Sequence, residues 1–63
     1  MTYKILYTSW YGGQRKVIVF DFKRGCTIEF TLDELKKEEL DLELKEYIRG
    51  IKENIDSGYW DYQ

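Results

Sequence analysis

The glycine pair Gly12-Gly13 restricts the fold of this chain more than any other feature, because it separates two segments rich in aromatic and β-branched residues. Both central positions of a type I′ hairpin turn need a positive φ, which glycine adopts without steric cost. The pattern predicts antiparallel strands over about 3–10 and 16–22, with Trp10 opposite Arg15. Without interruption, this register also pairs Tyr7 with Ile18, Ile5 with Phe20, and Tyr3 with Phe22.

A second turn, Lys23-Arg24-Gly25, leads into a third predicted strand over about 26–31. If Gly25 takes the left-handed conformation of a three-residue hairpin loop, Phe22 lies opposite Cys26. The two registers agree, since both place the larger apolar residues on one face of the sheet. We expect this face to be the core side, formed by Tyr3, Ile5, Tyr7, Ile18, Phe20, Phe22, Cys26, Ile28 and Phe30.

The opposite face of the predicted sheet mixes apolar, aromatic and charged residues. Trp, Tyr and Arg are the residue types enriched at binding hot spots, and an apolar centre with a polar rim is typical of an interface. Trp10 and Arg15 are expected to form a cation–π pair across the hairpin. The predicted partner-binding surface consists of Leu6, Trp10, Tyr11, Arg15, Val17 and Val19.

The segment after the third strand is expected to be helical, over about 32–56. It begins with the capping box Thr31-Leu-Asp-Glu34, in which the Thr31 and Glu34 side chains each satisfy the other residue's backbone N–H. The apolar positions then change phase, because three leucines fall on the side opposite the main apolar stripe. They are Leu32, Leu35 and Leu42. We predict a short helix over 32–38, a bend over 39–41 and a main helix to about 56; one continuous helix, covered on its second side by another copy of the chain, is the alternative.

The end of the chain, 57–63, is unusually aromatic. Ser57-Gly58 predicts the end of the helix, with Gly58 in the left-handed conformation after the cap. In one interpretation the tail docks, with Tyr59 against the helix end, Trp60 packed inward and Asp61 near Lys23 or Arg24. In the other, Trp60 and Tyr62 remain free and bind a partner, because chain ends are often poorly ordered.

The composition limits the chemistry that the chain can perform. It has no histidine and a single cysteine, Cys26, so the usual Ser–His and Cys–His nucleophile pairs cannot form. We therefore expect no enzymatic activity, cofactor, metal site or small-molecule substrate. The lone cysteine, the lack of a signal-peptide pattern and the absence of an apolar run of about 20 residues indicate a cytoplasmic protein without a membrane partner.

Charge is distributed unevenly along the chain, although the formal net charge is only −2. Residues 1–30 carry five basic and two acidic side chains, whereas residues 31–63 carry ten acidic and five basic ones. An acidic helix can occupy the groove of a nucleic-acid-binding protein in place of phosphates. The predicted acidic surface consists of Glu34, Glu38, Glu39, Asp41 and Glu43.

These features predict a single α+β domain spanning 1–63, with a three-stranded antiparallel meander and a bent or two-part helical segment on one face. Its composition, without His or Pro and rich in Lys, Glu and Tyr, resembles the small inhibitor proteins of phages and mobile elements, such as the anti-CRISPR proteins. The resemblance implies a non-enzymatic protein–protein interaction module that inhibits a host protein in the host cytoplasm. Two alternatives are a self-associating homodimer and a DNA- or RNA-binding domain using the exposed sheet face, an arrangement similar to that of plant ethylene-response-type domains.

Overall fold

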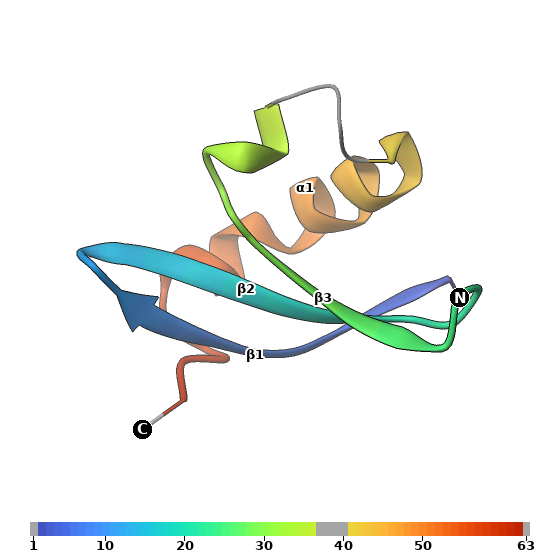
Figure 1. Ribbon diagram of the computed structural model, residues 1–63. Helices are drawn as coiled ribbons and strands as arrows, with labels where there is room; N and C mark the ends of the chain where they lie inside the picture. The colour runs from blue at the N-terminus through green and yellow to red at the C-terminus, as the bar shows by residue number, and fades with distance from the viewer. Residues whose placement is uncertain (1, 37–40, 63) are drawn as a thin grey trace.

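Three strands and two helical elements form an α+β fold in the computed structural model, which describes residues 2–36 and 41–62. Strands β1 (Tyr3–Tyr11), β2 (Gln14–Asp21) and β3 (Cys26–Thr31) make an antiparallel sheet of order β1-β2-β3. A single 3-10 turn, η1 (Glu34–Lys36), follows, and then the helix α1 (Leu42–Asp56). Figure 1 shows α1 and η1 on the same side of the sheet, which leaves its other face uncovered.

The β1–β2 hairpin begins as the glycine pair predicts. Gly12 and Gly13 have φ values of 60° and 78°, and Trp10 lies opposite Arg15. Beyond the Tyr7–Ile18 pair the register shifts at a bulge, so that Ile5 lies opposite Val19 and Tyr3 opposite Asp21. The predicted pairing of these two residues with Phe20 and Phe22 is therefore wrong.

The physical reason for this bulge lies in the charge of Lys4. Thr8 and Val17 are fully buried on the helix side of the sheet, and side chains alternate between the two faces. An uninterrupted β1 would carry Lys4 to the buried side. One extra residue between Ile5 and Tyr7 reverses the phase, so that Tyr3 and Ile5 enter the core while Lys4 remains exposed.

The β2–β3 turn is one residue longer than predicted, which changes the phase of β3 as well. Residues 22–25 form the turn, with Gly25 at φ 66°, and Asp21 lies opposite Cys26. The Asp21 carboxylate accepts hydrogen bonds from the backbone N–H groups of Lys23 and Arg24, at 2.9 and 3.2 Å. This side-chain-to-backbone turn, of a kind that aspartate favours, stabilises the longer loop.

Because side chains alternate with a period of two, the two shifts exchange residues between the faces. The core cluster contains Tyr3, Ile5, Val17, Val19, Phe30, Leu44, Ile48 and Ile55. Val17 and Val19 are thus fully buried rather than exposed. Tyr7 and Phe22, expected in the core, are exposed on the other face. Cys26, also expected in the core, is exposed at the start of β3 although it shares the phase of the buried Phe30.

The capping box is confirmed, but the helix that it starts is short. Thr31 N–H donates to Glu34 Oε1 at 2.9 Å, and Glu34 N–H donates to Thr31 Oγ1 at 3.2 Å. The main helix begins separately, after Asp41, whose carboxylate accepts from the Glu43 N–H at 3.3 Å. The helical segment is therefore in two parts, as predicted, although residues 37–40 of the expected first helix and bend lie outside the described residues.

The two-part arrangement also buries two of the three out-of-phase leucines in part. Leu32 and Leu35 pack against the core cluster from the η1 side, whereas Leu42 is 68% exposed on α1. The chain leaves β3 at Thr31, opposite Lys16, and enters α1 beside Tyr3, whose hydroxyl donates to Asp41 Oδ2 at 2.8 Å. Helix α1 therefore ends near the β1–β2 hairpin, beside Arg15, and not near the β2–β3 turn, where Asp61 was expected beside Lys23 or Arg24.

The aromatic tail docks on the sheet. Gly58 has φ 82°, and the N–H groups of Gly58 and Tyr59 donate to the carbonyls of Ile55 and Asn54, as in a Schellman motif. The chain then runs beside β1, where Thr8 N–H donates to Trp60 O at 2.8 Å and Tyr62 N–H donates to Thr8 O at 2.7 Å. Trp60 packs against the core, whereas the Tyr59 ring is 72% exposed.

Within the described part of the chain, no helix is both long enough and apolar enough to cross a membrane.

Candidate functional site: the open sheet face

The sheet face opposite α1 carries a cluster of large apolar side chains. Leu6 and Tyr7 lie between the inward-facing Ile5 and Thr8, and they are 43% and 40% exposed. Ile18 and Phe20 alternate with the buried valines of β2. We use the name open face for Lys4, Leu6, Tyr7, Ile18, Phe20 and Phe22, together with Tyr62 of the tail.

Contacts within the open face hold several of these side chains in place. The rings of Phe20 and Phe22 meet edge-to-face, with centroids 4.8 Å apart, and the Tyr7 and Tyr62 rings are 5.7 Å apart. Ile18 is only 6% exposed, yet it is not part of the core cluster under α1. The open face is therefore a second apolar cluster, and Phe22 remains 53% exposed at its edge.

Charged groups border this cluster without forming a basic surface. The Lys16 ammonium lies 3.5 Å from Glu29 and 4.8 Å from the centre of the Tyr11 ring. Lys4, opposite Phe20, is exposed and has no ion-pair partner among residues 2–36 and 41–62. The border thus offers one available cation and one neutralised pair.

The docked tail is held at the outer edge of β1 through the carboxylate of its own Asp61. Arg15 Nε and one of its terminal nitrogens donate to the two oxygens of Asp61, each at 3.0 Å, and the Thr8 hydroxyl also donates to Asp61. These hydrogen bonds from Thr8 and Arg15 hold the pKa of Asp61 below its usual value. Because Asp61 is anchored here, the neighbouring Tyr62 ring is carried onto the open face beside Tyr7. The ion pair uses Arg15, not Lys23 or Arg24 as expected.

The predicted partner-binding surface is divided by the structure. Leu6 and Tyr11 are exposed on the open side, and Tyr11 is 71% exposed. Trp10 and Arg15 form the predicted cation–π pair, at 4.6 Å, but they share the phase of the buried Val17 and so lie on the helix side. Val17 and Val19 belong to the core and are inaccessible to a partner.

The predicted acidic surface is also used partly for structure. The Glu34 side chain belongs to the capping box, and Asp41 caps α1 while it accepts from the Tyr3 hydroxyl. The Tyr3 hydrogen bond, followed by that from Glu43 N–H, lowers the pKa of Asp41. Glu43 is exposed and lies 3.4 Å from Lys23. Glu38 and Glu39 lie outside the described residues.

Four open-face residues, Tyr7, Ile18, Phe20 and Phe22, were assigned to the core by sequence reasoning. The segment Val17-Ile18-Val19 is apolar at consecutive positions, so its pattern does not show which face is buried. One signal points to the correct phase, because Asp21, placed just before the turn, favours a longer loop.

The open face presents side chains suited to contact with another surface. Among residues 2–36 and 41–62 no three His, Cys, Asp or Glu side chains are grouped to hold a metal ion. The exposed groups are rings, methyl groups and one ammonium, which can bury apolar area against another surface.

No protein-family model, curated protein or solved structure shows significant similarity to the chain.

Proposed function

We propose that the protein is a non-enzymatic protein-interaction domain that binds its partner through the open face. The observation that carries this proposal is the second apolar cluster, in which Leu6, Tyr7 and Phe22 are each at least 40% exposed on one side of the sheet. Exposed apolar side chains gathered in one patch are typical of interaction sites. Aromatic residues that are already held by neighbours lose little conformational freedom on binding, which favours affinity.

The same geometry gives less support to nucleic-acid binding. Bases stack on rings that present their flat faces, but Phe20 and Phe22 meet edge-to-face with their planes at 74°. A nucleic-acid-binding surface also carries several cations for phosphates. The open face has Lys4 as its available cation, and the whole chain has a net charge of −2.

The finer hypothesis, inhibition of a host protein by a phage-type protein in the cytoplasm, rests on composition. Mimicry of nucleic acid by the acidic helix has weaker support, because Lys45, Arg49 and Lys52 are interleaved with the acids of α1. Self-association through the open face is the alternative outcome of the experiment, since two copies of this sheet can pack face to face.

The experiment compares three proteins in affinity capture from a cell extract: the unmodified chain, the double variant Leu6→Ser/Phe22→Ser, and the control Leu42→Ser. Leu42 is an apolar residue even more exposed than Leu6 and Phe22, but it lies on α1, away from the open face. We expect the open-face variant to lose the captured partner and the control to retain it. Thermal unfolding of all three proteins checks that the variants remain folded.

Two further measurements separate the alternatives. Sedimentation at micromolar concentration detects a dimer, and loss of that dimer in the open-face variant alone indicates self-association. Binding to mixed single-stranded DNA and RNA at low salt, where phosphate contacts are strongest, tests the nucleic-acid hypothesis. The proposal is wrong if the open-face variant captures the same partners as the unmodified chain.

A further inference from the structure

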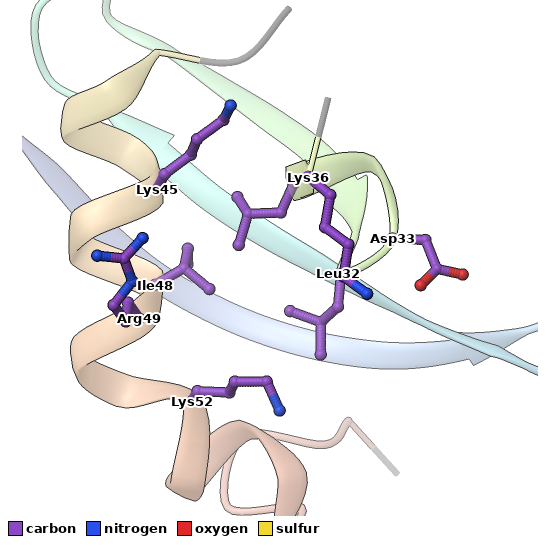
Figure 2. A pocket seen from close by; sticks show the side chains of 8 residues that line it. Leu32, Asp33, Lys36, Lys45, Ile48, Arg49 and Lys52 are labelled. Carbon is purple, nitrogen blue, oxygen red and sulfur yellow. The ribbon is translucent and has the colours of Figure 1, made fainter. Parts of the chain in front are cut away.

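A hollow of about 560 Å³ lies between η1 and α1, on the helix side of the molecule. Its floor is aliphatic, formed by Leu32, Leu35 and Ile48. Figure 2 shows the Leu32 and Ile48 side chains pointing toward each other across the hollow, with Lys45 and Lys52 extending from α1 on either side of Ile48. The volume falls within the range of protein sites that bind ligands.

Cations surround this aliphatic floor. Lys45, Arg49 and Lys52 follow one face of α1 at spacings of four and three residues, and Lys36 extends from η1 opposite them. Asp33 is the one acidic residue in the lining. Four of the chain's ten basic residues therefore surround one hollow, although the chain as a whole is acidic.

The cations are available to a ligand. Lys36 and Lys45 have no ion-pair partner within 2–36 and 41–62. Arg49 and Lys52 pair with Glu46 and Asp56, at 3.7 and 2.7 Å, but all four of these side chains are at least half exposed. Exposed ion pairs of this kind contribute little stability, so a ligand carboxylate can replace them at small cost.

We infer that this hollow binds an acidic peptide segment of a partner protein, with one bulky apolar side chain inserted between η1 and α1. The aliphatic floor accepts the apolar side chain, and the lysines contact carboxylates on either side of it. A bare phosphate would find only flexible lysine and arginine side chains around an apolar floor. A nucleic-acid base would find no aromatic ring in the lining to stack on. Charge complementarity together with the aliphatic floor thus favours the peptide.

This site is separate from the open face, because α1 and η1 cover the other side of the sheet. The inference does not rest on the proposed function. A partner can be bound at one surface, at the other, or at both, and substitutions at Leu6 and Phe22 are expected to leave peptide binding unchanged. Failure of either proposal therefore leaves the other to be judged on its own data.

The test uses a short fluorescein-labelled peptide with a central Leu-Phe pair flanked by glutamates, measured by fluorescence polarisation at low salt. Two matched peptides replace either the glutamates by glutamine or the Leu-Phe pair by Ser-Ser. The protein variants are Lys36→Gln/Lys45→Gln and the control Lys23→Gln, which removes an exposed cation at the β2–β3 turn. Neither the Lys36 nor the Lys45 side chain donates a hydrogen bond within the described residues, so the double variant is expected to fold, as a thermal melt will verify.

We expect the glutamate peptide to bind the unmodified chain, and the double variant to bind it at least about tenfold more weakly, while Lys23→Gln has little effect. Both matched peptides should bind more weakly than the first. The inference is overturned if the glutamate peptide does not bind, if the double variant binds it normally, or if the Ser-Ser peptide binds equally well. Equal competition by inorganic phosphate or by oligothymidylate would also overturn it, in favour of a simple anion site.

Discussion

Replacing Gly50 by alanine is expected to stabilise this protein. Gly50 lies in the middle of α1, is exposed, and has no positive φ. A Cβ built there meets no atom within 4 Å. The fold therefore contains nothing that a methyl group at this position would displace.

The magnitude follows from helix propensity alone, because the new methyl group neither clashes nor packs. Glycine is about 1 kcal/mol less favourable than alanine in the interior of a helix. Domains gain unfolding entropy of about 2.1 cal/mol/K per residue, so that 1 kcal/mol corresponds to about 8 °C in the melting temperature of a chain of 63 residues.

The same substitution at Gly58 is the matched control, and its effect should have the opposite sign. Gly58 has φ 82°, where an alanine costs about 1–2 kcal/mol. Its Cβ would also lie 3.0 Å from Asp61 Oδ2, an oxygen that Arg15 already holds. The clash would disturb the attachment of the tail to β1.

Urea unfolding of the two variants, followed by circular dichroism, measures both effects in one assay. We expect the midpoint to rise for Gly50→Ala and to fall for Gly58→Ala, with the slope unchanged. A Gly50→Ala midpoint at or below that of the unmodified chain would refute the reasoning, because it would mean that α1 approaches another part of the molecule at Gly50.

Two other predictions concern the ties between the sheet and the rest of the chain. The Tyr47 hydroxyl accepts from the Ile5 N–H at 2.9 Å, so Tyr47→Phe should lower stability by about 1 kcal/mol, whereas Tyr59→Phe, at an exposed ring, should have little effect in the same urea assay. Acid should also destabilise the fold, because three carboxyl groups have pKa values below the usual range, at Asp21, Asp41 and Asp61. The stability that these carboxylates contribute is complete above the unfolded pKa of about 3.9 and is lost as the pH falls through the lower folded pKa values. Asp61→Asn should make the urea midpoint less sensitive to pH in that window. An unchanged pH dependence of the midpoint would contradict the role given to Asp61.

The tail shows how a correct local prediction can lead to a wrong contact. Ser57-Gly58 ends the helix as predicted, and Trp60 packs inward. Asp61 nevertheless pairs with Arg15, because α1 runs toward the hairpin and not toward the β2–β3 turn. The sequence contains the cap but carries no signal for the direction of α1, which begins beside Tyr3 in the structure.

Prediction of the candidate site from the sequence was limited in the same way, because local patterns did not determine which residues share a face. The prediction that one sheet face is exposed and partly aromatic is supported, but its members changed when two register shifts exchanged the faces. Val17-Ile18-Val19 is apolar on both sides, so either face of β2 can be buried at nearly equal gain in apolar area. The basic hollow was missed altogether, because Lys36 and the lysines of α1 meet only once η1 folds back against the helix.

Local features of the sequence by themselves determined the glycine hairpin, the strand order, the capping box and the stop of α1. Each depends on residues within a few positions of one another, whose φ preferences and side-chain hydrogen bonds act before any packing occurs. Only the tertiary structure decided which face of the sheet became the core. That choice required a bulge in β1 and a longer β2–β3 turn, which together bury Tyr3, Ile5 and the two valines under α1 while Lys4 stays in water.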